Sequence, residues 1–295
     1  MFVPKAQSPG LAAALIVAAS AFIAASTLMA KTLTTGVLGP ALHPLQVSHG
    51  RFLFALLLIG ALALRLRPRF EAVHWRLHIG RTAFGWGGVT LMFAAVGFIP
   101  MADATAITFL NPVVAMIIAI PLLGERVGPI RWSAAGLALI GAMVLLRPTP
   151  ASFQPGALLA LAAAVVMGME VILIKKLTGR EAPFQILVLN NVLGVCIATV
   201  AVLFVWQQPS ALQWAGLVAV GGLMACAQVF FLNGMARADA SYVAPFTYAV
   251  LIFAALYDFL SFGAVPDWVS VAGITIILSG GLLLALREAQ LRRAP

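Results

Sequence analysis

Ionisable side chains are scarce in this chain, where 9% of the residues are charged, and a few of them interrupt long apolar stretches. Each one inside a membrane would cost roughly 3 kcal/mol, which makes it a functional candidate by default. Glu170 could bind a proton or pair with an amine, or it could be held near a membrane surface by hydrogen bonds. Arg51, beside His49, offers a planar fork for a carboxylate, or equally bonds helix ends. For Asp258 we expect interhelical hydrogen bonding instead of solute binding.

Spacing gives no support for catalysis. His74 and His78 stand four residues apart, as a metal pair on a helix would, but the sequence pattern supplies no third ligand. No Gly-x-Ser-x-Gly elbow, phosphate-binding Gly-Lys loop or dinucleotide fingerprint occurs. Cys196 and Cys226 stand inside apolar runs and are expected to be small buried side chains. We therefore predict no catalytic residue, no metal site and no cofactor.

The elements that carry these residues are predicted to cross a lipid bilayer. The 295 residues are 62% hydrophobic with a mean hydropathy of +1.05, which is unusual for a water-soluble domain. A spanning helix needs roughly 20 apolar residues because the hydrocarbon core is about 30 Å thick. Ten such runs occur, approximately at 11–30, 45–64, 77–97, 102–122, 130–146, 156–174, 184–206, 212–233, 240–262 and 269–286. The first could be a signal peptide, but it is long and begins a continuous series, so we retain it as a span.

Basic residues predict the orientation of the bundle. If the amino terminus is cytoplasmic, nearly all Lys and Arg residues fall in cytoplasmic segments, and Lys31 and Arg147 fall in external ones. The net charge of +9 is thus spread over every internal loop, which argues against a nucleic-acid partner.

Two halves of the sequence resemble each other. Ala-Asp-Ala-Thr-Ala-Ile at 102–107 has its counterpart in Ala-Asp-Ala-Ser-Tyr-Val at 238–243, and Ala135-Gly136 in Ala272-Gly273. We divide the chain into residues 1–147 and 148–295, with five spans each. Five is odd, so the second half must enter the membrane from the opposite side, as in many alternating-access carriers. The predicted fold class is an all-α membrane protein with ten transmembrane helices in two inverted five-helix repeats.

Prolines mark candidate hinges in the fourth and ninth spans. Pro112 and Pro245 each lack an amide proton, so the carbonyls of Thr108 and Ser241, four residues back, are expected to be freed. Irregular backbone at membrane depth persists only where protein or cavity water satisfies it. These two spans are therefore predicted to be cavity walls or hinges.

Aromatic and polar side chains of the same spans form the predicted solute site. A mixed lining of this kind suits an amphipathic small molecule such as an amino acid, although packing is the alternative role for any single ring. The candidates are Trp86, Thr90, Phe93, Thr108, Asn111, Glu170, Gln228, Asn233, Tyr242 and Tyr248, with Pro112 and Pro245 as hinges.

Several short motifs add a family resemblance. They are Ser48-His-Gly-Arg51-Phe52, Gly85-Trp86, Asn111-Pro112 and Leu-Leu-Gly-Glu125-Arg126, then Val243-Ala-Pro245-Phe246 and Ala272-Gly273. In order and spacing the chain resembles the drug/metabolite transporter superfamily, in its two-repeat EamA branch, and within it the bacterial amino-acid exporters of the YddG type. It departs at Gly263-Ala264, where the second repeat of the family often has Gly-Glu. The resemblance implies a secondary carrier with a central cavity.

The resulting prediction is a monomeric carrier in a bacterial-type inner membrane, with both termini cytoplasmic and the lipid bilayer and a small-molecule substrate as partners. We expect it to export small amphipathic metabolites, amino acids first, without covalent chemistry. A proton-coupled uptake carrier that uses Glu170 is the nearer alternative. A non-transporting receptor or an intramembrane enzyme is a weaker one.

Overall fold

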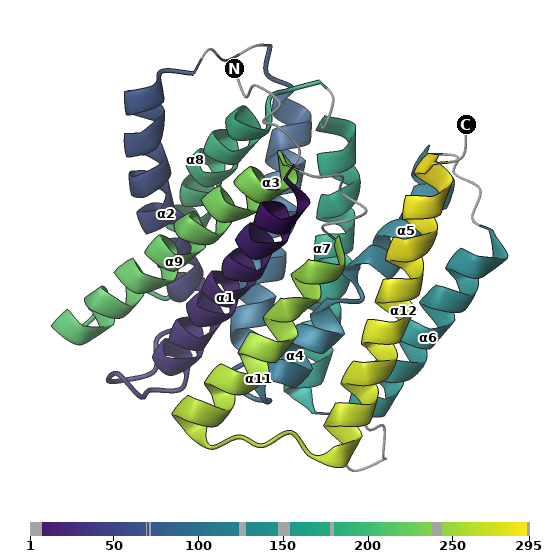
Figure 1. Ribbon diagram of the computed structural model, residues 1–295. Helices are drawn as coiled ribbons and strands as arrows, with labels where there is room; N and C mark the ends of the chain where they lie inside the picture. The colour runs from purple at the N-terminus through teal and green to yellow at the C-terminus, as the bar shows by residue number, and fades with distance from the viewer. Residues whose placement is uncertain are drawn as a thin grey trace.

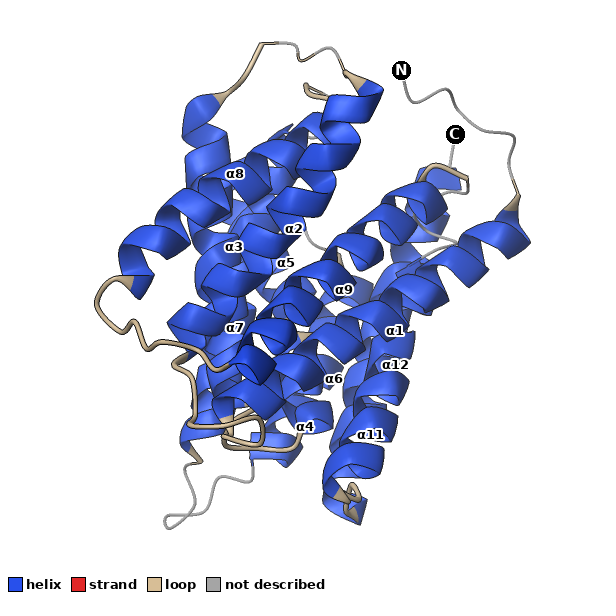
Figure 2. Ribbon diagram, turned by 90° about the vertical axis from the view of Figure 1, so that its left-hand side faces the viewer, coloured by secondary structure: helices blue, strands red, loops and turns tan. Residues whose placement is uncertain are grey.

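The computed structural model describes residues 8–68, 70, 72–123, 128–146, 154–177, 180–237 and 244–293, and within these ranges the fold is helical with no β-strand (Figure 1 and Figure 2). The elements are α1 (Pro9–Thr34), α2 (Pro44–Leu66), α3 (Trp75–Ala95), α4 (Met101–Thr108), α5 (Asn111–Leu123), α6 (Pro129–Leu146), α7 (Pro155–Leu177), α8 (Pro183–Val202), α9 (Ala211–Met235), the 3₁₀-helix η1 (Ala244–Tyr248), α11 (Ala249–Phe262) and α12 (Trp268–Arg293). The predicted all-helical class is confirmed.

Local sequence explains where several helices begin. Pro9, Pro44 and Pro183 occupy the first turns of α1, α2 and α8, where a missing N–H costs no hydrogen bond. α9 begins with a capping box, in which the Ser210 N–H donates to Gln213 Oε1 at 2.9 Å and the Gln213 N–H donates to Ser210 Oγ at 3.3 Å. These starts fall close to the predicted span boundaries.

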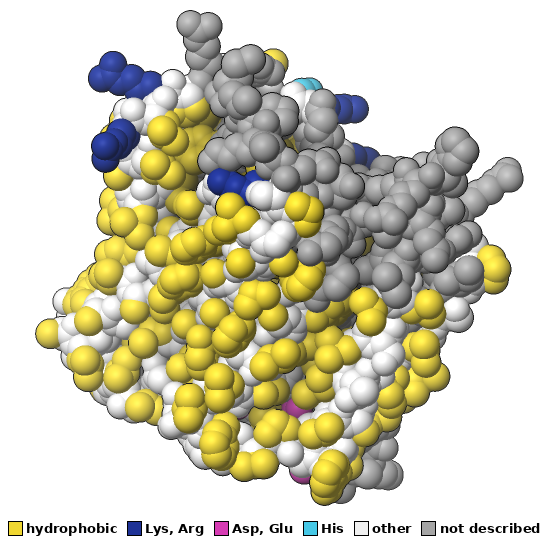
Figure 3. All heavy atoms as spheres, viewed as in Figure 1, with side chains coloured by type: hydrophobic (Ala, Val, Ile, Leu, Met, Phe, Trp, Pro, Cys, Tyr) yellow, Lys and Arg dark blue, Asp and Glu magenta, His cyan; other side chains and the backbone are white. Residues whose placement is uncertain are grey.

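Six of the described helical segments are long and apolar enough to cross a bilayer, namely α1, α2, α4 with α5, α7, α8 and α9. α3 is less apolar because it carries His78, Arg81 and several glycines. Large apolar side chains such as Leu57, Phe204 and Ile252 are exposed, and Figure 3 shows hydrophobic side chains across the middle of one face. A surface of this kind belongs in lipid instead of water, so the chain is a multi-pass membrane protein.

The bundle has two distinct ends. α1 begins and α12 ends at the same end, which we call the termini end; the other is the opposite end (Figure 1). Lys and Arg side chains lie toward the termini end in Figure 3. Those exposed at helix ends there include Arg65, Arg67, Arg76 and Arg180.

Packing between helices follows a regular scheme. α1 packs along α9 and against α11, whereas α7 packs along α3 and against α5, and α2 contacts α8. α6 and α12 pack on each other through small residues: a Cβ on Gly141 would lie 2.7 Å from Ile277 Cγ1, and Ala138 and Ala142 are buried. Small residues allow this close approach of the two helix backbones.

Candidate functional site

The fourth predicted span is not one helix but two. α4 ends at Thr108 and α5 begins at Asn111, and together they form the predicted apolar span over 102–122. The cause of the break is Pro112, which cannot donate to the Thr108 carbonyl four residues back. The Asn111 side-chain amide takes that place, donating from Nδ2 to the Thr108 carbonyl at 3.0 Å. The freed acceptor predicted from the proline is therefore satisfied by the adjacent candidate site residue.

The described part of the ninth span begins as a 3₁₀-helix, and this segment lies beside the α4–α5 break. Pro245 lies in η1, and α11 continues from Ala249. The ring of Tyr248, at the end of η1, lies 5.1 Å from the ring of Phe109, in the α4–α5 break. Ser20 Oγ on α1 donates to the Thr247 carbonyl at 3.4 Å. Both proline-containing spans thus bring irregular backbone to one region of the bundle.

A cluster of three charged residues joins α2, α3 and α7. Arg81 Nε lies 3.4 Å from Glu170 Oε1, and both side chains are largely buried. Arg51 from α2 is 7% exposed and interacts electrostatically with both Glu170 and Arg81. Gly85, one turn beyond Arg81, makes room for the carboxylate, since a Cβ there would lie 2.6 Å from Glu170 Oε1. The sequence singled out Glu170 and Arg51 but assigned no role to Arg81, although an arginine within an apolar run was the available signal.

Several buried polar atoms of α2, α3 and α8 have no hydrogen-bond partner among the described residues. They are Arg51 Nε, Arg81 Nε and Nη1, Thr82 Oγ1, Trp86 Nε1, Asn190 Oδ1 and Asn191 Oδ1. These atoms belong to α2, α3 and α8, which contact one another. A buried polar group left without a partner costs about 1–3 kcal/mol, so a group of them indicates a place where a polar ligand or water is bound.

The other predicted site residues on α3 and α4 differ in burial and in hydrogen bonding. Trp86 is half-buried, and its backbone carbonyl accepts a hydrogen bond from Thr90 Oγ1 at 2.8 Å. Thr108 Oγ1 donates to the Ala104 carbonyl at 2.8 Å. Phe93 is 2% exposed and packs in a core cluster with Leu33 and other apolar residues, a position that suits packing.

The two described candidates on α9 both take part in polar contacts. Asn233 Nδ2 donates to the Val229 carbonyl at 2.9 Å, and its Oδ1 accepts from Arg237 Nη1 at 3.2 Å. Gln228 Oε1 lies 3.5 Å from Asn191 Nδ2. Tyr242 lies outside the described residues, as do the side chains of Pro112 and Pro245. The structure therefore places Glu170 in the charged cluster and brings Asn111 and Tyr248 together at the α4–α5 break.

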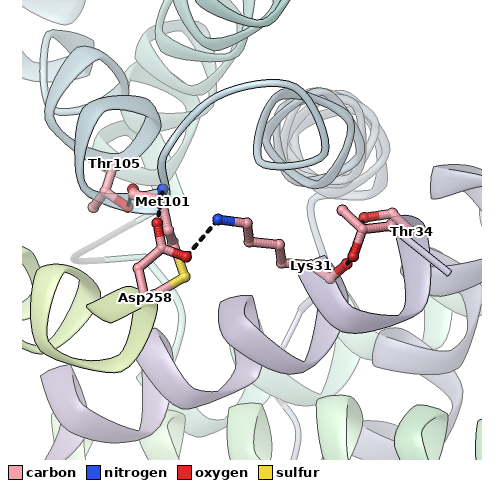
Figure 4. Close-up of polar contacts among 6 residues, drawn as sticks. Lys31, Thr34, Met101, Thr105 and Asp258 are labelled. Atoms are coloured by element: carbon pink, nitrogen blue, oxygen red, sulfur yellow. Dashed lines mark hydrogen bonds and ion pairs between the residues drawn. The ribbon is translucent and has the colours of Figure 1, made fainter. Parts of the chain in front are cut away.

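A buried ion pair ties three helices at the opposite end (Figure 4). The Lys31 ammonium, near the end of α1, pairs with Asp258 Oδ1 on α11, while Asp258 Oδ2 accepts from the Met101 N–H at 2.8 Å. Met101 begins α4, so the carboxylate also lies at the positive end of that helix. The expected interhelical role of Asp258 is confirmed. Lys31 itself lies inside α1, past the predicted end of the first span, and is 9% exposed.

A second buried carboxylate ties α3 to the start of α8 at the termini end. Glu181 accepts from the His74 N–H at 2.8 Å and lies 2.9 Å from His74 Nδ1 and 2.7 Å from His78 Nε2. Gln185 Nε2 also donates to it at 2.7 Å. Burial alone would raise the pKa of the Glu181 carboxyl, but these hydrogen bonds from His74 and His78, with the charge of His78, lower that pKa to about 2. The two histidines, considered above for metal, thus hold a carboxylate that their local sequence did not reveal.

Comparison with known proteins agrees with this architecture. The chain matches the EamA-like transporter family over residues 10–147 and again over 154–286. It is 33% identical over 246 residues to a riboflavin transporter of Rhizobium johnstonii, covering 83% of this chain and 80% of that protein. It is 26% identical over 258 residues to an S-adenosylmethionine uptake transporter of Rickettsia prowazekii, covering 85% and 86%.

A more distant relative and a solved structure complete the comparison. A pseudopaline exporter of Pseudomonas aeruginosa is 26% identical over 199 residues, covering 65% of this chain and 69% of that protein. A solved crystal structure that is 21% identical covers 93% of this chain and 98% of its own, with a TM-score of 0.65, and shows the same fold. None of these relatives is named as an amino-acid exporter, so the narrower resemblance stays a prediction. The chain therefore belongs to the EamA-like transporter family and is a membrane transporter, not an enzyme.

Proposed function

We propose that this chain is an alternating-access secondary carrier of a bacterial inner membrane, built from two inverted repeats of five spans. The helix pairing supports the repeats, because α1 with α9 and α11 has the same relation as α7 with α3 and α5. The family match also falls in two stretches of similar length. The basic residues at the termini end support a cytoplasmic location for both termini.

The proposed substrate is a small amphipathic metabolite that carries charges of both signs, with amino acids as the first class and outward movement as the direction. The observation that carries this is the buried cluster of Arg51, Arg81 and Glu170. Arginine suits a carboxylate, and a glutamate suits an ammonium. The α-amino-carboxylate group is common to amino acids and S-adenosylmethionine, the substrate named for one relative.

Riboflavin transport is the second candidate, and the 33% identical relative favours it. Riboflavin has no carboxylate, so it would use the aromatic surface and acceptor atoms of the site without neutralising its charge. The two candidate substrates therefore differ in whether their transport needs the charges of Arg51 and Glu170.

Counterflow in liposomes tests the proposal. Purified protein is reconstituted into vesicles preloaded with unlabelled L-phenylalanine, S-adenosylmethionine or riboflavin, and entry of the same labelled compound is followed. The proposal expects saturable, trans-stimulated entry of at least one compound that carries an amino-carboxylate group. Entry of riboflavin alone would favour the second candidate, and no trans-stimulated flux of any of the three would contradict carrier function for these classes.

The proton-coupled alternative has its own test at Glu170. Flux is measured with and without a pH gradient in the parent and in Glu170→Gln. If flux ignores the gradient and the variant behaves as the parent does, coupling through this carboxylate fails. If a gradient drives accumulation in the parent but not in the variant, coupling replaces facilitated exchange as the mechanism.

A further inference from the structure

The Arg51–Arg81–Glu170 cluster carries more positive charge than negative charge. Two guanidinium groups face one carboxylate, and Glu170 is the acid that interacts with both of them. Arginine stays protonated in proteins, so the cluster keeps a surplus of one positive charge even when Glu170 is ionised. A buried charge without its counter-ion is strongly unfavourable, which makes this surplus costly for the substrate-free protein.

Several N–H donors of the two arginines make no hydrogen bond to the described residues. Arg51 Nε, Arg81 Nε and Arg81 Nη1 are buried and have no hydrogen-bond acceptor among the described residues. Arg81 Nε lies 3.4 Å from Glu170 Oε1, an ion-pair distance, but the contact lacks hydrogen-bond geometry. The Arg51 guanidinium carbon lies 4.5 Å from the centre of the Phe52 ring, and the whole residue is 7% exposed. The N–H groups of both guanidinium groups therefore lie buried without a matching acceptor among the described residues.

α3 carries two further buried polar atoms without a partner among the described residues. They are Trp86 Nε1 and Thr82 Oγ1, which lie one helical turn apart. For the cluster itself, the surplus of positive charge and the unused planar donors indicate that its ligand carries a carboxylate.

We propose that Arg51 and Arg81 bind the carboxylate of the transported metabolite, while Glu170 pairs with Arg81 and accepts from the ammonium where the metabolite has one. This inference rests on the proposed carrier function and specifies its substrate class. The carboxylate group places a negative charge beside the surplus positive charge and accepts from two donors in the plane of a guanidinium. A neutral acceptor such as a flavin carbonyl leaves the surplus in place, and a dianionic phosphate exceeds it.

Ligand binding without transport gives the first test. The unfolding temperature of the purified protein in detergent is measured with L-phenylalanine, 3-phenylpropionate, L-phenylalaninamide and riboflavin, each titrated to its solubility limit. The two carboxylates are expected to raise the unfolding temperature, and the amide, which lacks the carboxylate, is expected to need at least about tenfold higher concentration, equivalent to about 1.4 kcal/mol. Equal effects of acid and amide, an effect of riboflavin alone, or no effect of either acid would overturn the proposal.

Variants separate binding from a structural role. Arg51→Gln removes a donor and the surplus charge, whereas Arg65→Gln, on the exposed end of the same helix, removes an equal charge from the surface. Arg51→Gln is expected to abolish stabilisation by the carboxylates while its ligand-free unfolding temperature equals or exceeds that of the parent. Arg65→Gln is expected to match the parent in both measurements. A large loss of ligand-free stability in Arg51→Gln, or retained carboxylate binding, would show a structural arginine and overturn the proposal.

The outcomes for this inference and for the carrier function are distinguishable. Carboxylate-dependent stabilisation that disappears in Arg51→Gln supports the inference even if no counterflow is found. Counterflow that is equal for L-phenylalanine and L-phenylalaninamide supports a carrier but contradicts the arginine–carboxylate contact.

Discussion

At the residue scale, we expect the loss of the buried Lys31–Asp258 pair at the opposite end to destabilise the protein. Asp258→Asn leaves the Lys31 ammonium buried without its counter-ion while retaining an acceptor for the Met101 N–H. Breaking a buried pair in this way costs about 3–5 kcal/mol, so we expect a large drop in unfolding temperature in detergent. Lys31→Met together with Asp258→Asn should recover most of the loss, because no unpaired charge remains. A double variant as unstable as the sum of both single variants would show that the two side chains do not interact.

Glu181 makes a pH-dependent contribution at the same scale. Its folded-state pKa lies at about 2, below the ordinary value of 4.5, because His74 and His78 hydrogen-bond the carboxylate. The lowered pKa means that the stabilisation is fully present above about pH 4.5 and is lost as the pH falls toward 2. Unfolding temperatures measured from pH 6 to pH 3 should therefore fall less steeply for Glu181→Gln than for the parent. Parallel curves would contradict the depressed pKa.

The sequence identified the individual charged candidates better than it identified their partners. Glu170 and Asp258 stood out because a carboxylate in an apolar run is rare. Lys31 is 227 residues from Asp258 and His78 is 103 residues from Glu181, and no local pattern encodes such distances. Which side chains pair between helices depends on how the helices pack. Neither periodicity nor composition specifies that packing.

At the scale of helices, glycines of α3 set its distance from α7. A Cβ on Gly88 would lie 2.5 Å from Met167 Cγ, whereas a Cβ on Gly87 would lie 3.5 Å from Val166 Cγ1, an ordinary contact. We expect Gly88→Ala to destabilise the protein by about 1–3 kcal/mol through overpacking, and Gly87→Ala to change stability little. Thermal unfolding of the two variants side by side measures the difference. Equal stabilities would mean that α3 and α7 are not in close contact here.

The same scale shows which parts of the fold were predictable. The helical segments follow the predicted apolar runs because bilayer thickness fixes their length, and prolines at their first turns mark several starts. The break between α4 and α5 was only partly foreseen. Pro112 predicted a freed Thr108 carbonyl, but the sequence could not show that Asn111 would satisfy it and leave two separate helices. How the helices surround the charged cluster also depends on packing that the sequence pattern does not specify.

At the scale of the whole molecule, the proposed orientation can be tested by labelling. In a variant with Cys196 and Cys226 replaced by alanine, Val37→Cys reports the opposite end and Arg180→Cys the termini end, since both positions are exposed. A membrane-impermeant maleimide added to intact spheroplasts should label the Val37→Cys variant only, and lysis should make the Arg180→Cys variant reactive as well. Labelling of the Arg180→Cys variant before lysis would reverse the proposed orientation.

The contact between Lys31 and Asp258 also couples motion of the opposite end to hydration. Both charges are buried, so they can separate only if water enters to solvate them as α1 moves away from α11. Any state that opens this end is therefore a wetter state, and solutes that are excluded from the protein surface will disfavour it. In the proposed alternating-access cycle, we therefore expect raised osmotic pressure to favour the form in which this end is closed.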